Sequence, residues 1–393
     1  MKSELNSKGN YMINKERLAN LCDQLVRIDS VSKEEGEIAA YLKDIFAAMK
    51  AEVFVDHAGE KVGGQTGNLV AKFKGNVQAE PLLLAAHMDT VEPGRGVVPV
   101  FESGVFTSKG ETILGADDKS AIAVILEILH VLQEKNLPHG PLDVVMTICE
   151  EIGLLGAKHL DFDLISARYG YTVDATDTEG IVTKAPSANH IEFKVHGKAA
   201  HAGAKPENGI NAILVASKAI SGMEIGRIDR ETTCNIGVIQ GGLATNIVPD
   251  LVTVKGEARS HSEEKLQTVS DKMVAAFESA VSNFQSETDD ASLPFLECTV
   301  EREFTRTDIP ESHPVIQLAQ KAAKGLGRNL VCKITGGGAD ANVFCLHGID
   351  TGVLGTGMRE MHTTQESVAL EDMVKTAELL IEIIQRHARE KIQ

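Results

Sequence analysis

The chain has 393 residues, which is more than one hydrophobic core normally organises, so we expect two domains or one domain interrupted by another. Hydrophobic residues make up 43% and charged residues 24%, a composition typical of a globular protein. The formal net charge of −17, from 39 Lys and Arg against 56 Asp and Glu, argues against a nucleic-acid partner, because phosphate binding needs clustered positive charge.

No membrane or export signal stands out in the sequence. No apolar run approaches the roughly 20 residues that a membrane-spanning helix needs. The polar residues 1–18 lack the apolar core of a signal peptide, and Met12 offers an alternative start. The six cysteines form no C-x-x-C pair and lie mostly among apolar neighbours, so we expect reduced core residues. Together these features predict a cytoplasmic protein without a membrane partner.

The first 186 residues alternate between helical and strand-like patterns. Apolar spacing predicts helices within 14–50 and over 117–135, and strands at 51–57, 67–75, 81–90, 142–151 and 169–175. The runs at 81–90 and 142–151 are apolar almost throughout, as strands buried on both faces are. Alternation of this kind indicates an α/β fold with a layered sheet.

The pattern changes at about Ser187. We expect strands at 189–197, 233–242, 251–260 and 296–304, with helices at 209–223 and 262–284. Their order is βαββαβ, which is the ferredoxin-like order. After Pro310 the earlier style resumes, with a helix at 313–327, a strand at 330–335 and a last helix from about Leu370. We therefore predict an α/β domain formed by residues 12–186 and 309–393 and interrupted by a ferredoxin-like domain at 187–308.

Residues that commonly bind metals follow several of the predicted strands. They are His87, Asp89, Asp117, Asp118, Glu150, Glu151, Asp174 and His362. Each alone has an ordinary explanation, such as a helix cap for the aspartate pair. Most of them lie where open α/β sheets bind their ligands, at the carboxyl ends of predicted strands, while the aspartate pair begins a helix and His362 lies in a loop before the last helix. Two histidines with carboxylates and no thiolate predict zinc, with cobalt or manganese as alternatives.

The sequence also resembles a known family. The segments "HMDT", "GADDK", "EEIGLLGA", "VDA", "KAAHAG", "ATNIVPD", "GEARS", "GGGADAN" and "MHTTQE" occur in the order seen in the co-catalytic dizinc exopeptidases. That family includes peptidase T, aminoacylase and succinyl-diaminopimelate desuccinylase, and the resemblance, from about residue 15 to 390, is nearest to the peptidase T-like proteins. It implies a phosphorylase/hydrolase-like catalytic domain with a central mixed sheet flanked by helices, interrupted by a lid domain.

The resemblance assigns a role to each motif residue. It implies that the ligands of two divalent metal ions are His87, Asp117, Glu151, Asp174 and His362, and that Asp117 bridges the ions and is joined to Asp118 by a cis peptide. Glu150 becomes the general base and Asp89 the orienting partner of His87. Adjacent glutamates can take such different roles because neighbouring side chains on an extended chain point to opposite sides. Substrate contacts are implied for His201, Asn246, Arg259 and Gly337.

The implied function is a metallo-exopeptidase that releases the N-terminal residue of short peptides, above all tripeptides, with metal-bound hydroxide as nucleophile. A carboxypeptidase, dipeptidase or N-acyl-amino-acid deacylase on the same metal core remains an alternative. A non-catalytic metal-binding protein is a further one, although it would not need Glu150. Asp177 or Glu179 could bind a free amine, but "TDTEG" is also an ordinary acidic turn. Lid domains of this family often dimerise, which allows a homodimer here.

Overall fold

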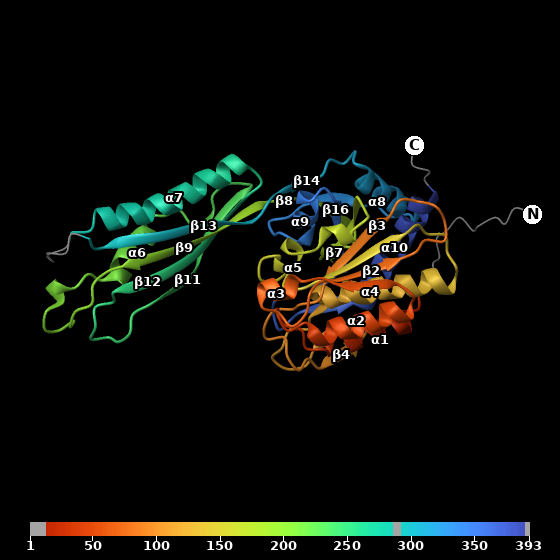
Figure 1. Cartoon of the computed structure of the whole chain (residues 1–393), viewed down its shortest axis with the longest axis horizontal. Helices are drawn as coiled ribbons and strands as arrows, with labels where there is room; N and C mark the ends of the chain where they lie inside the picture. The colour runs from red at the N-terminus through yellow and green to blue at the C-terminus, as the bar shows by residue number, and fades with distance from the viewer. Residues whose placement is uncertain (1–12, 286–291, 390–393) are drawn as a thin grey trace, which may run out of the picture. The chain divides into compact units, whose positions relative to one another are not determined.

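The computed structural model describes residues 13–285 and 292–389, and the alternative start at Met12 lies outside them. Its contacts divide the chain into two compact units, which Figure 1 shows. The larger unit takes the described parts of Met1–Lys184, Thr307–Thr335 and Ala339–Gln393, and the smaller unit takes those of Ala185–Arg306 and Gly336–Gly338. By their contacts, Gly336–Gly338 group with the smaller unit.

A mixed sheet forms the centre of the larger unit. Within the described residues it has nine strands, in the order β1-β2-β6-β3-β7-β16-β8-β14, with β15 paired to β8. The strands are β1 (Glu52–Val55), β2 (Leu69–Phe73), β3 (Leu82–His87), β6 (Leu142–Thr147), β7 (Tyr169–Ala175), β8 (Gly180–Ala185), β14 (Thr307–Asp308), β15 (Val331–Ile334) and β16 (Asp350–Gly355). The neighbours β6, β3, β7 and β16 run parallel, so their carboxyl ends meet at one edge of the sheet.

Helices cover both faces of this sheet. The helices of the larger unit are α1 (Lys15–Val26), α2 (Gly36–Ala48), α3 (Ala58–Val62), α4 (Ala116–Glu134), α5 (Leu155–Lys158), η1 (Phe162–Leu164), α8 (Pro314–Gly325), α9 (Asp340–Leu346) and α10 (Leu370–Arg389). Because alternate residues of β3 face opposite sides, Leu82 and Leu84 belong to the core that includes side chains of α1, α2, α4, α8 and α10, whereas Leu83 belongs to a second core with Phe344 of α9. The helix α4 is buried along most of its length because α1 and α10 cover it where it packs on the sheet.

A second, three-stranded sheet in the larger unit is not expected from the sequence. It consists of β4 (Pro99–Glu102), β5 (Val105–Ser108) and β17 (Ser367–Ala369), all antiparallel. Strands of three or four residues carry too little alternation to be recognised from a pattern. Phe106 of β5 and Val368 of β17 are paired and buried. The sheet therefore connects the segment before α4 with the segment before α10.

The described residues of the smaller unit form one antiparallel sheet and two long helices. Its elements are β9 (Ser187–His196), η2 (Pro206–Asn208), α6 (Ala212–Ser221), β10 (Gly226–Arg227), β11 (Thr232–Gly241), β12 (Leu251–Ser260), α7 (Glu263–Ser282) and β13 (Phe295–Phe304). The strand order, as described, is β10-β11-β12-β9-β13, so apart from the short β10 the topology is ferredoxin-like. Phe193 of β9 stacks on Phe277 of α7 with ring centroids 3.9 Å apart, in the core beneath the helices.

The predicted α/β class, with a central mixed sheet flanked by helices, is confirmed. The expected core position of the cysteines holds for Cys22, Cys149 and Cys234 but is wrong for Cys298, which is exposed on the edge strand β13. All six cysteines are free thiols. Among the described helices, none combines the length and the apolar character that crossing a membrane requires.

Candidate active site

Three parallel strands of the larger unit end in residues that the sequence singles out. His87 is the last residue of β3, Glu150 and Glu151 follow β6, and Asp174 lies next to the end of β7. Because β3 pairs in parallel with both β6 and β7, these side chains reach the same edge of the sheet. His87 and Glu150 are buried, and Glu151 and Asp174 are half-buried.

The start of α4 brings two aspartates to this edge. Asp117 and Asp118 have non-helical backbone dihedral angles, so the regular helix begins after them. The peptide bond between them is cis, as the family resemblance implies. The two carboxylates therefore do not lie on the helix surface as simple caps, and both are buried.

Asp117 lies between two histidines. Its Oδ1 is 3.1 Å from His87 Nε2, and its Oδ2 is 3.3 Å from His362 Nε2. The same His362 nitrogen is 3.0 Å from Glu151 Oε1. His362 comes from the loop between β16 and β17, so three segments far apart in the sequence converge on one carboxylate.

The histidine contacts favour a cation at this position. His87 Nδ1 donates to the carbonyl oxygen of Asp89 at 2.9 Å, which leaves the lone pair of the neutral ring on Nε2. That lone pair faces the carboxylate of Asp117, and two acceptors at hydrogen-bond distance require a proton or a metal ion between them. Hydrogen bonds with Asp117 and Glu151 raise the pKa of His362 to about 10, so the surroundings of this second histidine favour positive charge as well.

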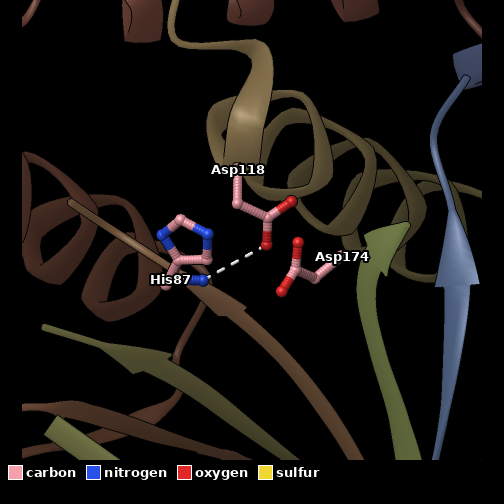
Figure 2. A group of neighbouring side chains, drawn as sticks. All are labelled: His87, Asp118 and Asp174. Atoms are coloured by element: carbon pink, nitrogen blue, oxygen red, sulfur yellow. Dashed lines mark hydrogen bonds between the residues drawn. The ribbon is translucent and has the colours of Figure 1, made fainter. Parts of the chain in front are cut away.

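A second group of side chains surrounds His87. Figure 2 shows His87, Asp118 and Asp174, with the backbone N–H of His87 donating to Asp118 Oδ2 at 3.3 Å. The two carboxylates face each other, and the buried Asp118 Oδ1 has no hydrogen-bond partner among the described residues. One ligand atom from each of the three residues lies within 4.8 Å of the others, and the same holds for His87, Asp117 and Glu151. The two groups share His87, and each could hold a metal ion.

Negative charge accumulates here beyond what the protein itself neutralises. Burial raises the pKa of Asp118, Asp174 and Glu150 above the ordinary carboxyl range, and neighbouring carboxylates add to the effect. Burial also acts to raise the pKa of Asp117, but hydrogen bonds with His362 and His87 outweigh it and keep that pKa low. Buried carboxylates of this number need a positive partner, so the site fits divalent metal ions.

Asp89 has contacts beyond the one that would orient His87. Its Oδ1 is 3.4 Å from His87 Nδ1, but it accepts a closer bond from the backbone N–H of Glu150 at 2.9 Å. Its Oδ2 accepts from the hydroxyl of Ser32 at 2.6 Å and from the N–H of Glu151 at 3.2 Å. Asp89 thus holds the backbone of both glutamates, and the sequence contained no signal for the contribution of Ser32.

Two predicted substrate residues lie on paired segments of the smaller unit. His201 forms a bridge with Ile247, and the N–H of Ala202 donates to the carbonyl oxygen of Asn246 at 2.9 Å. His201 Nδ1 accepts the N–H groups of Gly203 and Ala204, both at 3.2 Å. The proton of the neutral ring is therefore on Nε2, which can donate to a ligand. His201 and Asn246 are both exposed.

Arg259, at the end of β12, already has a carboxylate partner. Its Nη2 and Nε lie 2.8 and 3.1 Å from the two oxygens of Glu257, and its Nη1 donates to the carbonyl oxygen of Gly336 at 3.5 Å. This bidentate contact has the geometry that a substrate carboxylate would use.

The glycine segment that carries Gly337 lies against the smaller unit. A Cβ on Gly338 would lie 2.6 Å from the ring of Phe304, so one of the three glycines has a packing reason to be there. The turn with the acidic candidates is also accounted for locally. Asp177 Oδ1 accepts the N–H of Glu179 at 2.8 Å and Oδ2 is 3.0 Å from Lys333 Nζ, which favours the ordinary acidic turn.

Two buried carboxylic acids near the site were not predicted. Glu366 accepts three backbone N–H groups from the segment that leads into Asp117. Asp340, at the start of α9, accepts the hydroxyl hydrogen of Thr147, and burial raises its pKa to about 6. Both lie in segments that carry the family resemblance, "GGGADAN" and "MHTTQE", but their partners are distant in the sequence, so the segments did not indicate these contacts.

Comparisons with known proteins show the family of the chain. Residues 83–386 match the model of Peptidase family M20/M25/M40, which is more than half of the chain. The protein YqjE of Bacillus subtilis (strain 168) is 42% identical over 379 residues, which cover 96% of this chain and 100% of that protein.

Two crystal structures are similar along nearly the whole chain. Aminopeptidase PepT from Bacillus cereus ATCC 10987 is 41% identical with a TM-score of 0.83, and a tripeptidase from Staphylococcus aureus subsp. aureus mu50 is 39% identical with a TM-score of 0.88. Each similarity covers 96% of this chain and 100% of the other. The chain therefore belongs to peptidase family M20/M25/M40, and the enzyme class predicted from the sequence, a metallo-exopeptidase, is confirmed.

Proposed function

We propose that the protein is a dimetal aminopeptidase that removes the N-terminal residue of tripeptides. The observation that carries the proposal is the position of the Asp117 carboxylate, within 3.3 Å of both His87 and His362. A carboxylate between two imidazoles is the arrangement that a shared ligand of two ions needs. Similarity to an aminopeptidase and to a tripeptidase at about 40% identity supports the choice of substrate.

The proposal assigns one ion to His87, Asp117 and Asp174, with Asp118 beside them, and a second ion to Asp117, Glu151 and His362. Zinc suits this mixture of imidazole and carboxylate ligands, and cobalt and manganese are alternatives. When bound, two such cations polarise the scissile carbonyl group and lower the pKa of the attacking water.

Glu150 is the proposed general base. Its side chain is 9% exposed, and Asp89 holds its backbone N–H at 2.9 Å. Burial raises the pKa of the Glu150 carboxyl group above its ordinary value, which strengthens its ability to accept a proton. Glu150 takes a proton from the attacking water and then gives it to the leaving amine.

The smaller unit supplies the proposed substrate contacts. His201 Nε2 donates to the oxygen that becomes negative in the tetrahedral transition state. Arg259 binds the C-terminal carboxylate of the peptide in place of Glu257, since the guanidinium fork matches either carboxylate. Asn246 and the backbone at Gly337 hold the remaining polar groups of the peptide.

The test combines metal exchange with a peptide series. After exhaustive treatment with a chelator, the protein should lose its activity, and zinc, cobalt or manganese should restore it. A tripeptide with a free amino group should be cleaved after its first residue, and its N-acetylated form should resist. Full activity without metal would refute the metal assignment. Preference for N-acetylated substrates, or release of the C-terminal residue, would favour the deacylase or carboxypeptidase alternative.

We also propose a cytoplasmic location and a homodimer. Free thiols at all six cysteines fit a reducing compartment, which supports the predicted cytoplasmic location. A homodimer through the smaller unit stays a prediction, which size-exclusion chromatography with light scattering tests.

A further inference from the structure

Glu366 occupies an unusual position for an acidic side chain. It is 1% exposed, and its carboxylate accepts three backbone hydrogen bonds. Oε2 accepts the N–H groups of Leu114 at 2.8 Å and of Gly115 at 2.7 Å, and Oε1 accepts the N–H of Asp117 at 2.9 Å. The three donors lie on the short segment that presents Asp117, so Glu366 holds the backbone of the proposed shared ligand.

The loop that contains Glu366 also contains His362. An antiparallel bridge closes this loop, with the N–H of Arg359 donating to Ser367 at 2.9 Å and the reverse bond at 3.1 Å. Inside it, the N–H of Glu366 donates to the carbonyl oxygen of Thr363 at 3.1 Å. His362 and Glu366 therefore belong to the same loop, which the bridge between Arg359 and Ser367 closes. A contact from Glu366 to the Asp117 backbone fixes where His362 lies relative to Asp117.

The geometry requires a carboxylate at this position. Three N–H groups converge on two oxygens, and each oxygen of a carboxylate can accept them. A glutamine would keep one acceptor and turn an NH₂ group toward at least one N–H donor. The buried backbone donor left unpaired would then draw the segment away, since unsatisfied buried polar groups are costly.

We infer that Glu366 is a positioning residue for the metal centre, which sets the spacing between Asp117 and His362 and with it the binding of the second ion. The inference rests on the proposed function, because the same residues hold the ions there. Glu366 touches neither the substrate nor the ions in this role; it acts through the backbone of Asp117.

The experiment measures metal binding separately from catalysis. Metal-free wild type, Glu366→Gln, Glu366→Asp and the control Glu371→Gln are titrated with cobalt against a competing chelator, with the visible cobalt spectrum as readout. Glu371 is a matched control, because its side chain is 64% exposed and forms a surface ion pair with Lys15 at 2.6 Å. Tripeptide kcat and KM are measured on the same samples.

Glu366→Gln should bind the second ion about 10–100-fold more weakly, as loss of an outer support of a metal ligand typically does. Its kcat should fall more than its KM rises, and its cobalt spectrum should change. Glu366→Asp keeps the charge and should recover part of the affinity, which also provides a test if the glutamine variant does not fold. The control should match wild type in every measurement.

Two ions bound by Glu366→Gln with wild-type affinity and an unchanged cobalt spectrum, together with a lower melting temperature, would overturn the inference and leave Glu366 a residue of the fold alone. Wild type that binds two ions but cleaves no peptide would refute the proposed function and not the inference, because the titration judges the inference without substrate.

Discussion

The two units present their chemistry in opposite ways. In the larger unit the predicted ligands sit at the ends of parallel strands, and their contacts run to one another, from His87 to Asp117 and from there to His362. In the smaller unit His201 contacts its own loop, and Arg259 contacts Glu257 two residues away. The proposed metal ligands therefore contact one another inside one unit, whereas the proposed substrate residues of the other unit contact only nearby segments of their own unit.

This difference predicts two kinds of variant. Substitutions at the strand ends should change metal content or turnover on every substrate. Substitutions in the smaller unit should leave the metals in place, and their cost should depend on which group the substrate presents.

The largest effect is expected for Glu150→Gln. Only the proton transfer is lost, which typically contributes 10²–10⁴-fold to kcat, and both ions should remain bound. The matched variant Glu151→Gln should lose metal, because it removes a ligand oxygen at nearly the same place in the chain. Metal analysis of the two purified variants separates the roles, and an empty site in Glu150→Gln would mean that the two glutamates have exchanged them.

A smaller and selective effect is expected for Arg259→Ala. Arg259 is half-buried, so loss of its charge-assisted hydrogen bonds to the substrate carboxylate should cost about 1.5–3 kcal/mol, and kcat/KM for a tripeptide with a free C-terminus should fall accordingly. The same peptide as a C-terminal amide lacks the charge that Arg259 meets, and its kcat/KM should change little. Metal content should equal that of wild type.

Glu257 sharpens this test because it competes for the same guanidinium group. Its carboxylate occupies the fork at 2.8 and 3.1 Å. Glu257→Gln should weaken that pairing and lower KM for the free-acid peptide while KM for the amide stays constant. Equal losses on acid and amide in Arg259→Ala, with no effect of Glu257→Gln, would make Arg259 a structural residue of β12.

The strand-end residues were the predictable part of the site. The runs "LLLAAH" and "LDVVMT" are apolar at almost every position, and every residue of β3 and β6 is buried in the structure. Such runs predict parallel strands covered on both faces, and polar residues at their ends must then meet at one edge. The ligand types of His87, Glu151 and Asp174 add the metal hypothesis to that geometry.

Contacts between distant segments were not predictable. Glu366 meets its three backbone partners across 249 to 252 residues of sequence, through a sheet whose strands are too short for a pattern. Asp118 joins His87 and Asp174 because two residues at the start of α4 depart from helical dihedral angles, which side-chain spacing does not encode. Both features depend on backbone geometry rather than on residue type.

The smallest predicted effect on kcat is expected for Ser32→Ala, with Ser30→Ala in the same short segment as its control. Ser32 donates to the Asp89 carboxylate at 2.6 Å, while Ser30 donates to the carbonyl oxygen of Met88 at 2.8 Å. Both substitutions to alanine remove one hydroxyl, and each should lower the free energy of unfolding by about 1 kcal/mol or somewhat more for the charged partner.

Only Ser32→Ala should also alter kinetics, because the Asp89 carboxylate holds the N–H groups of Glu150 and Glu151. With one of its three donors gone, that carboxylate can shift, and the general base shifts with it. A loss in kcat of about threefold is expected from a displacement that costs roughly half of one hydrogen bond. Ser30→Ala should keep wild-type kcat at a similar loss of stability. Equal kcat for the two variants would show that Asp89 positions the glutamates without help from Ser32.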